Sequence, residues 1–60
     1  MFRIGDLAKK IDNQRLYLVV NVNEKEEECE LLYIYDNPNT AQSICCAFSE
    51  LTFISHIEVI

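Results

Sequence analysis

A strict two-residue alternation at positions 16–23 restricts the fold more than any other feature of the sequence. Residues of one parity are Leu16, Leu18, Val20 and Val22, and those of the other are Tyr17, Val19, Asn21 and Asn23. A period of two places successive side chains on opposite faces of an extended chain, and β-branched residues favour that conformation. The segment is therefore predicted to be a β-strand.

Shorter apolar runs separated by polar turns predict the remaining elements. Extended segments are expected at 2–6, 29–35, 41–48 and 52–54, and one 3₁₀ turn is expected near Ser49-Glu50-Leu51. The stretch 36–40 has turn chemistry, because Pro38 fixes its own φ and Asp36 can hydrogen-bond neighbouring backbone groups. We therefore expect an all-β chain that forms one domain over residues 1–60.

This succession of elements resembles small bacterial SH3-like β-barrels. In that family an opening Phe-x-Ile-Gly-Asp strand leads into a long first loop, three meandering strands, a single 3₁₀ turn and a short closing strand. The matching residues are the Gly5-Asp6 pair and the Phe48-Ser49-Glu50-Leu51 junction, with the first loop at 9–15. The resemblance covers nearly the whole chain and implies a small five-stranded barrel, and the apolar residues beyond Ile54 lie outside the family pattern as a C-terminal extension. At the level of the fold it implies little about function.

The opening segment also resembles a different family. Residues 2–10 contain an Ile-Gly-Asp-Leu-Ala-Lys run similar to the start of the first helix in MerR-type winged-helix DNA-binding regulators. That resemblance implies a helix capped by Asp6 and a MerR-like DNA-binding fragment. It ends at Leu16, because a β-like run stands where the recognition helix of that family would follow. The barrel is the preferred expectation.

The net charge of the chain distinguishes between a nucleic acid and a protein as the expected partner. The chain carries ten acidic and five basic residues, for a net charge of −5. Nucleic-acid binding relies on a positive surface that displaces counterions, so the composition argues against direct contact with DNA or RNA. The expected partner is another protein, and a basic one would be attracted electrostatically.

The apolar runs are short, and the cysteine number is odd. A helix needs about 20 apolar residues to span a bilayer, and neither such a run nor a signal-peptide core occurs in the sequence. Three cysteines fit a reducing compartment better than a secreted disulfide framework. We therefore expect a cytoplasmic protein without membrane association. A bacterial or phage origin is what the resemblance to small bacterial barrels and the similarity to small acidic phage inhibitors imply.

Cysteine and histidine are the residues whose chemistry needs separate consideration. Adjacent residues on a strand point to opposite faces, so Cys45 and Cys46 cannot readily hold one zinc ion. Cys46 and Cys29 are predicted to lie in the core, whereas Cys45 is expected at the surface with its reactivity left open. His56 is the only histidine, and no Gly-rich nucleophile loop accompanies it. We expect a binding or regulatory module with no catalytic site, metal or cofactor.

Three tyrosines are the first candidate contact residues. Tyr33 and Tyr35 share one parity of a predicted strand, and Tyr17 lies on the preceding one. Tyrosine combines a large contact area with a polar tip, and SH3-like barrels often hold extended peptides with such rings. The alternative is that these rings complete the core.

An acidic cluster is the second candidate surface. Its members are Glu24, Glu26, Glu27, Glu28 and Glu30, with Lys25 among them. One interpretation is a solvated loop that keeps the chain soluble and discourages edge pairing. The other is a surface for a basic partner, in which glutamates imitate phosphates and the chain acts as an inhibitor or decoy of a nucleic-acid-binding protein.

The segment 53–60 is too apolar to be left in solvent. It is expected either to close the sheet as an extra strand or to pair with another chain at an edge. The sequence therefore raises the hypothesis of a homodimer formed through residues 53–60.

Overall fold

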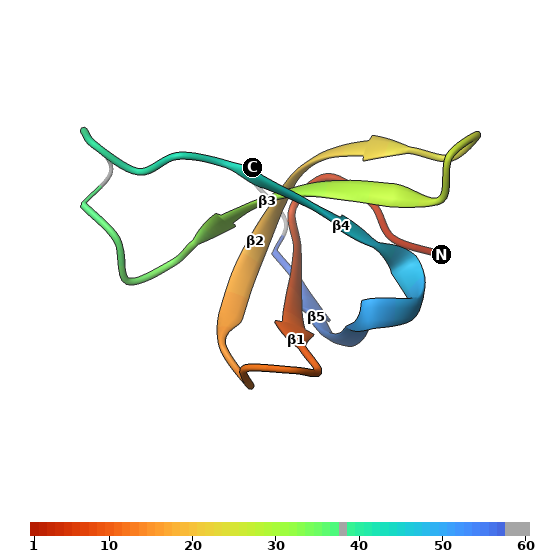
Figure 1. The fold of residues 1–60 in the computed structure, drawn as a ribbon, viewed down its shortest axis with the longest axis horizontal. Coiled ribbons are helices and arrows are strands. Elements are labelled where there is room, and N and C mark those ends of the chain that lie inside the picture. The colour runs from red at the N-terminus through yellow and green to blue at the C-terminus, as the bar shows by residue number, and fades with distance from the viewer. Residues whose placement is uncertain (38, 58–60) are drawn as a thin grey trace.

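Five antiparallel strands and one 3₁₀ turn make up the protein in a computed structural model, which describes residues 1–37 and 39–57 (Figure 1). The elements are β1 (Asp6–Lys10), β2 (Leu16–Asn23), β3 (Glu28–Tyr33), β4 (Ile44–Ala47), η1 (Phe48–Glu50) and β5 (Leu51–His56). No α-helix occurs in the described part of the chain. The predicted all-β class is confirmed.

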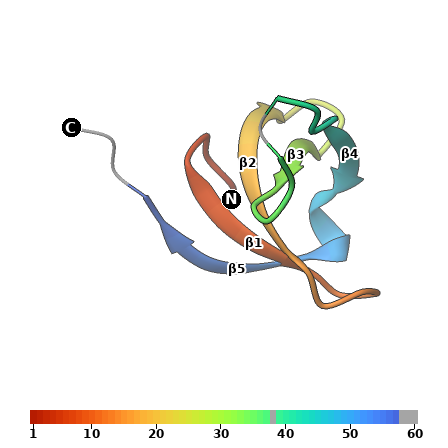
Figure 2. The same cartoon turned by 90° about the vertical axis from the view of Figure 1, so that its left-hand side faces the viewer.

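The sheet is strongly curled. Its strand order is β4-β3-β2-β1-β5, so that β4 and β5 lie at opposite edges. Only the three residues of η1 separate Ala47 at the end of β4 from Leu51 at the start of β5, and the four steps between these two Cα atoms span at most about 14 Å. The outer strands of a flat five-stranded sheet would lie about 19 Å apart. The edges therefore approach each other where η1 joins them, as the side view shows (Figure 2).

The concave face of this sheet holds the core. Its buried hydrophobic residues come from all five strands and are Ala8, Tyr17, Val19, Cys29, Leu31, Cys46 and Leu51. Phe2 and Phe48 pack against this group, with their ring centroids 5.6 Å apart. Cys29 and Cys46 are buried and Cys45 is exposed, which confirms the predicted positions of the cysteines.

A β-bulge in β2 determines which residues face the core. The ladder pairs Val19 with Leu31 but Asn21 with Glu30, so Val20 is one extra residue in β2. Before the bulge, Tyr17 and Val19 point inward; after it, the parity changes and Val22 packs against the core. Leu16 and Leu18, which share the other parity, therefore face outward from the sheet.

The first strand begins later than predicted, and it is not a helix. Gly5 has a positive φ of 95°, and the Asp6 N–H donates to the Arg3 carbonyl at 3.0 Å, which closes a turn before the strand. The strand expected at 2–6 therefore lies at Asp6–Lys10. The helix implied by the MerR-type resemblance is wrong, because this segment pairs with β2 on one side and β5 on the other.

The other predicted boundaries shift by smaller amounts. β2 coincides with the predicted segment 16–23, whereas β3 starts and ends earlier than the predicted 29–35. β4 starts at Ile44, three residues after the start of the predicted 41–48, and it ends at Ala47 because η1 already begins at Phe48, one residue before the predicted turn. β5 extends to His56, beyond the predicted 52–54.

Candidate binding surface

The three tyrosines form a continuous stack that runs from the core to solvent. Tyr17 and Tyr33 lie directly opposite each other in the β2–β3 ladder, with ring centroids 5.5 Å apart. The Tyr35 ring meets Tyr33 edge to face at 5.7 Å. Tyr17 is only 6% exposed, Tyr33 is half-buried and Tyr35 is 73% exposed. The structure thus brings the predicted residues together, with Tyr17 as the buried base and Tyr35 as the exposed tip.

The loop between β1 and β2 is fastened against this stack. The Arg15 guanidinium lies over the Tyr33 ring, 5.1 Å from Cζ to the centroid. The Asn13 amide donates to the Tyr17 hydroxyl at 3.2 Å, and its carbonyl oxygen accepts the Arg15 N–H at 2.9 Å. Gln14, between them, has φ 60° and closes the tight turn. The loop therefore adds a cation and an amide to the aromatic surface.

Arg15 and Asn13 were not identified from the sequence. Asn13, Arg15 and Tyr17 follow one another at intervals of two residues, which gave the only available signal, since this spacing in an extended segment places all three on one side. The contact of Arg15 with Tyr33 depends on the register between β2 and β3, which one sequence does not contain. A cation over an aromatic face contributes about 0.5–1 kcal/mol at an exposed site.

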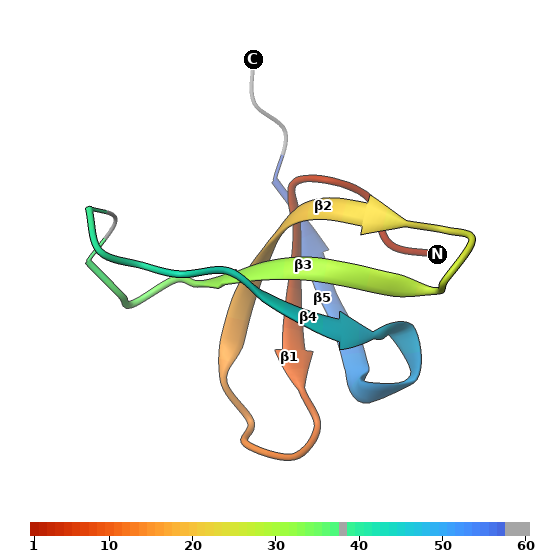
Figure 3. The same cartoon turned by 45° about the horizontal axis from the view of Figure 1, so that its top comes forward.

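The acidic cluster lies at the opposite end of the β2–β3 hairpin from the tyrosines. β3 runs from Glu28 to Tyr33, so the hairpin turn and the tyrosine stack occupy opposite ends of the strand (Figure 3). Glu24, Glu26, Glu27 and Glu28 are exposed, and Glu30 is half-buried. Glu27 adopts φ 54°, and its carbonyl accepts the Phe48 N–H at 2.8 Å, so the turn is tied to η1. The two predicted surfaces are therefore separate.

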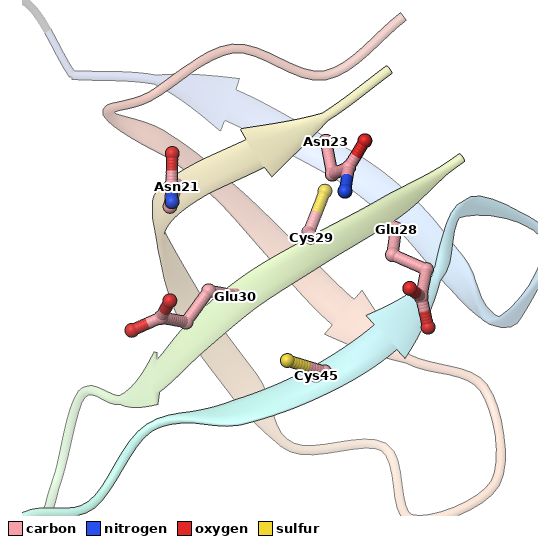
Figure 4. Close-up of a pocket in the computed structure, with 6 residues that line it drawn as sticks. All are labelled: Asn21, Asn23, Glu28, Cys29, Glu30 and Cys45. Atoms are coloured by element: carbon pink, nitrogen blue, oxygen red, sulfur yellow. The ribbon is translucent and has the colours of Figure 1, made fainter. Parts of the chain in front are cut away.

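A shallow polar depression of about 160 Å³ lies on the outer face of β2, β3 and β4 (Figure 4). Asn21, Glu30 and Cys45 form one cross-strand row in it, Asn23 and Glu28 are paired in a second row, and Cys29, whose side chain is buried in the core, completes the lining between the two rows. Among the described residues, no three His, Cys, Asp or Glu side chains converge in a way that could hold a metal ion. Cys46 points away from Cys45 into the core, as the alternation of the strand requires.

A larger depression, of about 320 Å³, lies between the β1–β2 loop and η1. It is lined by Ile11, Asp12, Ser49 and Glu50, and the Ile11 N–H donates to the Glu50 carbonyl at 3.0 Å. Asp12 forms a 3.3 Å ion pair with Lys10. The Cys46 thiol donates to the Glu50 carboxylate at 3.1 Å; burial and this carboxylate raise the pKa of Cys46 to about 11. The cysteine therefore stays a protonated thiol at neutral pH.

Asp6, which is buried, and His56, which is half-buried, form a pair at one end of the β1–β5 ladder, where the first residue of β1 lies opposite the last residue of β5. Asp6 is 1% exposed; its Oδ1 lies 2.6 Å from His56 Nδ1, and its Oδ2 accepts the Arg3 N–H at 2.8 Å. Burial acts to raise the pKa of Asp6, but the Arg3 N–H and the His56 ring outweigh it and hold the pKa below its usual value. An ionised carboxylate can only accept, so His56 carries the proton on Nδ1. The pair lines neither depression, and its role is to fasten β5 to β1.

The end of β5 leaves apolar side chains in solvent. Phe53, Ile54 and Ile57 are all exposed, with Phe53 at 54%. β5 is an edge strand, and the ladder with β1 is irregular at Ile54. Residues 58–60 of the segment expected to mediate a homodimer lie outside the described residues.

No helix in the described residues is long and apolar enough to cross a membrane. Comparison of the chain with protein-family models, with curated proteins and with solved structures found no match.

Proposed function

We propose that the chain is a non-enzymatic, SH3-like β-barrel module that binds another protein through Tyr33, Tyr35 and Arg15. The observation that carries this proposal is the position of Tyr35, a largely exposed ring held edge to face on a stack that begins in the core. Such a ring loses little conformational entropy when a partner covers it, because tyrosine has only two side-chain torsions to fix. Tyrosine and arginine are also the residues most enriched among strong contact residues of protein interfaces.

The SH3-like assignment is supported by the succession of elements. β2, β3 and β4 form a meander, η1 follows it, and β5 returns to lie beside β1. This succession is compatible with the arrangement that the resemblance implied, although the first loop covers only residues 11–15 where 9–15 was expected. Barrels of this type often bind extended peptides with aromatic side chains next to the first loop, which is where Arg15 meets Tyr33.

Affinity capture from a bacterial lysate tests the proposal. We expect the immobilised chain to retain a partner at both low and high salt, because an aromatic contact is only weakly screened. Tyr35→Ala should abolish that retention. Phe53→Ala is the matched control, since Phe53 is an exposed ring on a different strand, and it should leave retention unchanged. Equal retention by wild type and Tyr35→Ala would refute the proposed surface.

An acidic inhibitor or decoy is the second candidate. It is favoured by the four glutamates 24 and 26–28, which are all exposed at one hairpin end, where a basic surface could approach them. Replacing these four glutamates by glutamine should then abolish capture, and wild-type capture should be lost at high salt. Capture of nucleic-acid-binding proteins that persists in the glutamine variant would exclude this function.

A further inference from the structure

The outer face of β1, β2 and β3 carries an aliphatic patch that the core does not use. Leu7, Leu18 and Leu32 are paired across the three strands and form one row. In the adjacent row, Leu16 lies next to Lys9, and the Ile34 N–H donates to the Leu16 carbonyl. Because Ala8, Tyr17 and Leu31 point inward, these side chains point outward. We define the leucine face as Leu7, Leu16, Leu18, Leu32 and Ile34.

This face is unusual for an antiparallel sheet with one covered side. The uncovered side of such a sheet normally carries polar residues, and a contiguous aliphatic patch marks an interaction site. The four leucines remain partly exposed, and Ile34 is 39% exposed. The neighbouring part of the same face follows the usual rule, since Asn21, Glu30 and Cys45 stand there. The leucine face therefore is a local exception and not a property of the whole sheet.

We propose that the leucine face is the interface of a homodimer, in which the leucine faces of two copies pack against each other. The charged residues at the corners of the patch indicate that a second copy of the chain covers it. Lys9 on β1 lies at one corner and Glu30 on β3 at the diagonally opposite corner, two rows away. A two-fold axis in the plane of the patch, perpendicular to the line from Lys9 to Glu30 and passing through its midpoint, places Lys9 of each copy over Glu30 of the other. The patch is thus complementary to itself.

The same geometry fixes the packing at the centre. Leu18 lies on the middle strand and in the middle row, so the two-fold axis passes close to it, and it meets its own copy. The strands of the two sheets then cross steeply, which is one of the two regular ways in which sheets pack face to face. Within one chain, Lys9 pairs with Leu16 and Thr52, and Glu30 pairs with Asn21 and Cys45, so the two charged residues are not cross-strand neighbours.

Sedimentation equilibrium of the full chain tests the dimer. We expect a reversible monomer–dimer equilibrium for the wild type and a monomer for Leu18→Glu at the same concentrations. Lys9→Glu and Glu30→Lys should each weaken association on the order of tenfold, because each places like charges at both symmetry-related contacts. The double variant Lys9→Glu/Glu30→Lys should restore association, which a merely structural role of either residue would not do.

Two outcomes of the sedimentation experiment would overturn the proposal. One is a wild type that stays monomeric up to millimolar concentration. The other is a dimer that survives Leu18→Glu but is lost in Ile54→Lys, which would move the interface to the C-terminal segment. If the charge swap fails to restore association, the two-fold arrangement is wrong.

Cross-linking gives a second measurement that does not depend on a charged substitution. In a Cys45→Ser background, Leu18→Cys should form a disulfide-linked dimer under mild oxidation, because position 18 lies near the axis. Ile54→Cys in the same background is the control and should stay monomeric on a non-reducing gel. Equal cross-linking at both positions would contradict the proposed interface.

Discussion

Leu31 and Leu32 are adjacent leucines on the same strand, yet they have opposite roles. Leu31 is fully buried in the concave core, opposite Val19 and Ile44. Leu32 faces outward beside Leu18 and keeps part of its surface in solvent. The sequence offers no difference between them, because residue type and strand propensity are identical. The position of the core is decided by the pairing register and by the curl of the sheet, and not by the hydrophobicity of a single strand face.

Replacing each leucine by alanine should give the largest expected difference in the free energy of unfolding. Leu31→Ala should lower the free energy of unfolding by about 2–5 kcal/mol, because it leaves a cavity in a small core. Leu32→Ala should lower it by about 1 kcal/mol or less, since the removed atoms are partly solvated already. Urea denaturation followed by circular dichroism at low micromolar concentration measures both values. Equal losses would show that the core does not lie on the concave face.

The Asp6–His56 pair allows the same comparison of a buried with an exposed position to be made for a charged side chain. The pKa of Asp6 is lowered by folding, so its ionised form stabilises the native state above its unfolded pKa of about 3.8. That contribution is lost as the pH falls below about 3.8 and through the lower native value. Asp6→Asn should therefore cost about 1–3 kcal/mol at pH 7. The difference from wild type should shrink in acid.

The control for the buried pair is an exposed carboxylate. Asp36→Asn removes a charge from an exposed turn and should change the stability by less than about 0.5 kcal/mol at any pH. Stability curves of the three proteins from pH 2 to pH 7 make the comparison. An Asp6→Asn variant whose deficit stays constant in acid would show that the carboxylate is not ionised in the native state.

Two neighbouring cysteines give a smaller contrast of the same kind. Cys46→Ala removes a buried thiol and its hydrogen bond to Glu50, which should cost about 1–2 kcal/mol. Cys45→Ala should change the stability by less than about 0.5 kcal/mol, because Cys45 is exposed. Thiol titration of the native wild type should label Cys45 alone, and Cys29 and Cys46 should react only after unfolding. Rapid labelling of Cys46 would mean that β4 does not hold its place in the core.

The strands were predictable to different degrees, for identifiable reasons. β2 was predicted with its observed bounds because its alternation is long and charged residues, Arg15 and Glu24, flank it. β1 was displaced because Gly5, with its positive φ, forms a turn where the apolar pattern Phe2–Ile4 indicated a strand. The bulge at Val20 was not predictable, since a valine is compatible with either face of a sheet. The valines at 20 and 22 therefore do not reveal which face they occupy. Boundaries of the short strands depend on their neighbours more than on their own residues.

The candidate site was predictable only in part. The shared strand face suggested that Tyr33 and Tyr35 would lie together, and their rings do meet, although Tyr35 follows the end of β3. That Tyr17 forms the buried base of the stack follows from the cross-strand pairing with Tyr33. The cation on this stack was missed because Arg15 reaches Tyr33 only through that same pairing. Contacts between strands require a register, and one sequence does not contain it.

The pairing of β1 with β5 has a consequence for the order of assembly. β1 finds β2 through a loop of five residues, but Asp6 meets His56 only 50 positions later along the chain. Closing so large a loop is entropically slow, whereas the hairpins between consecutive strands form locally. The meander from β1 to β4 should therefore form first. Until β5 pairs with it, the backbone groups on one edge of β1 remain without strand partners. During that interval the open edge of β1 is the place where a wrong strand could be captured.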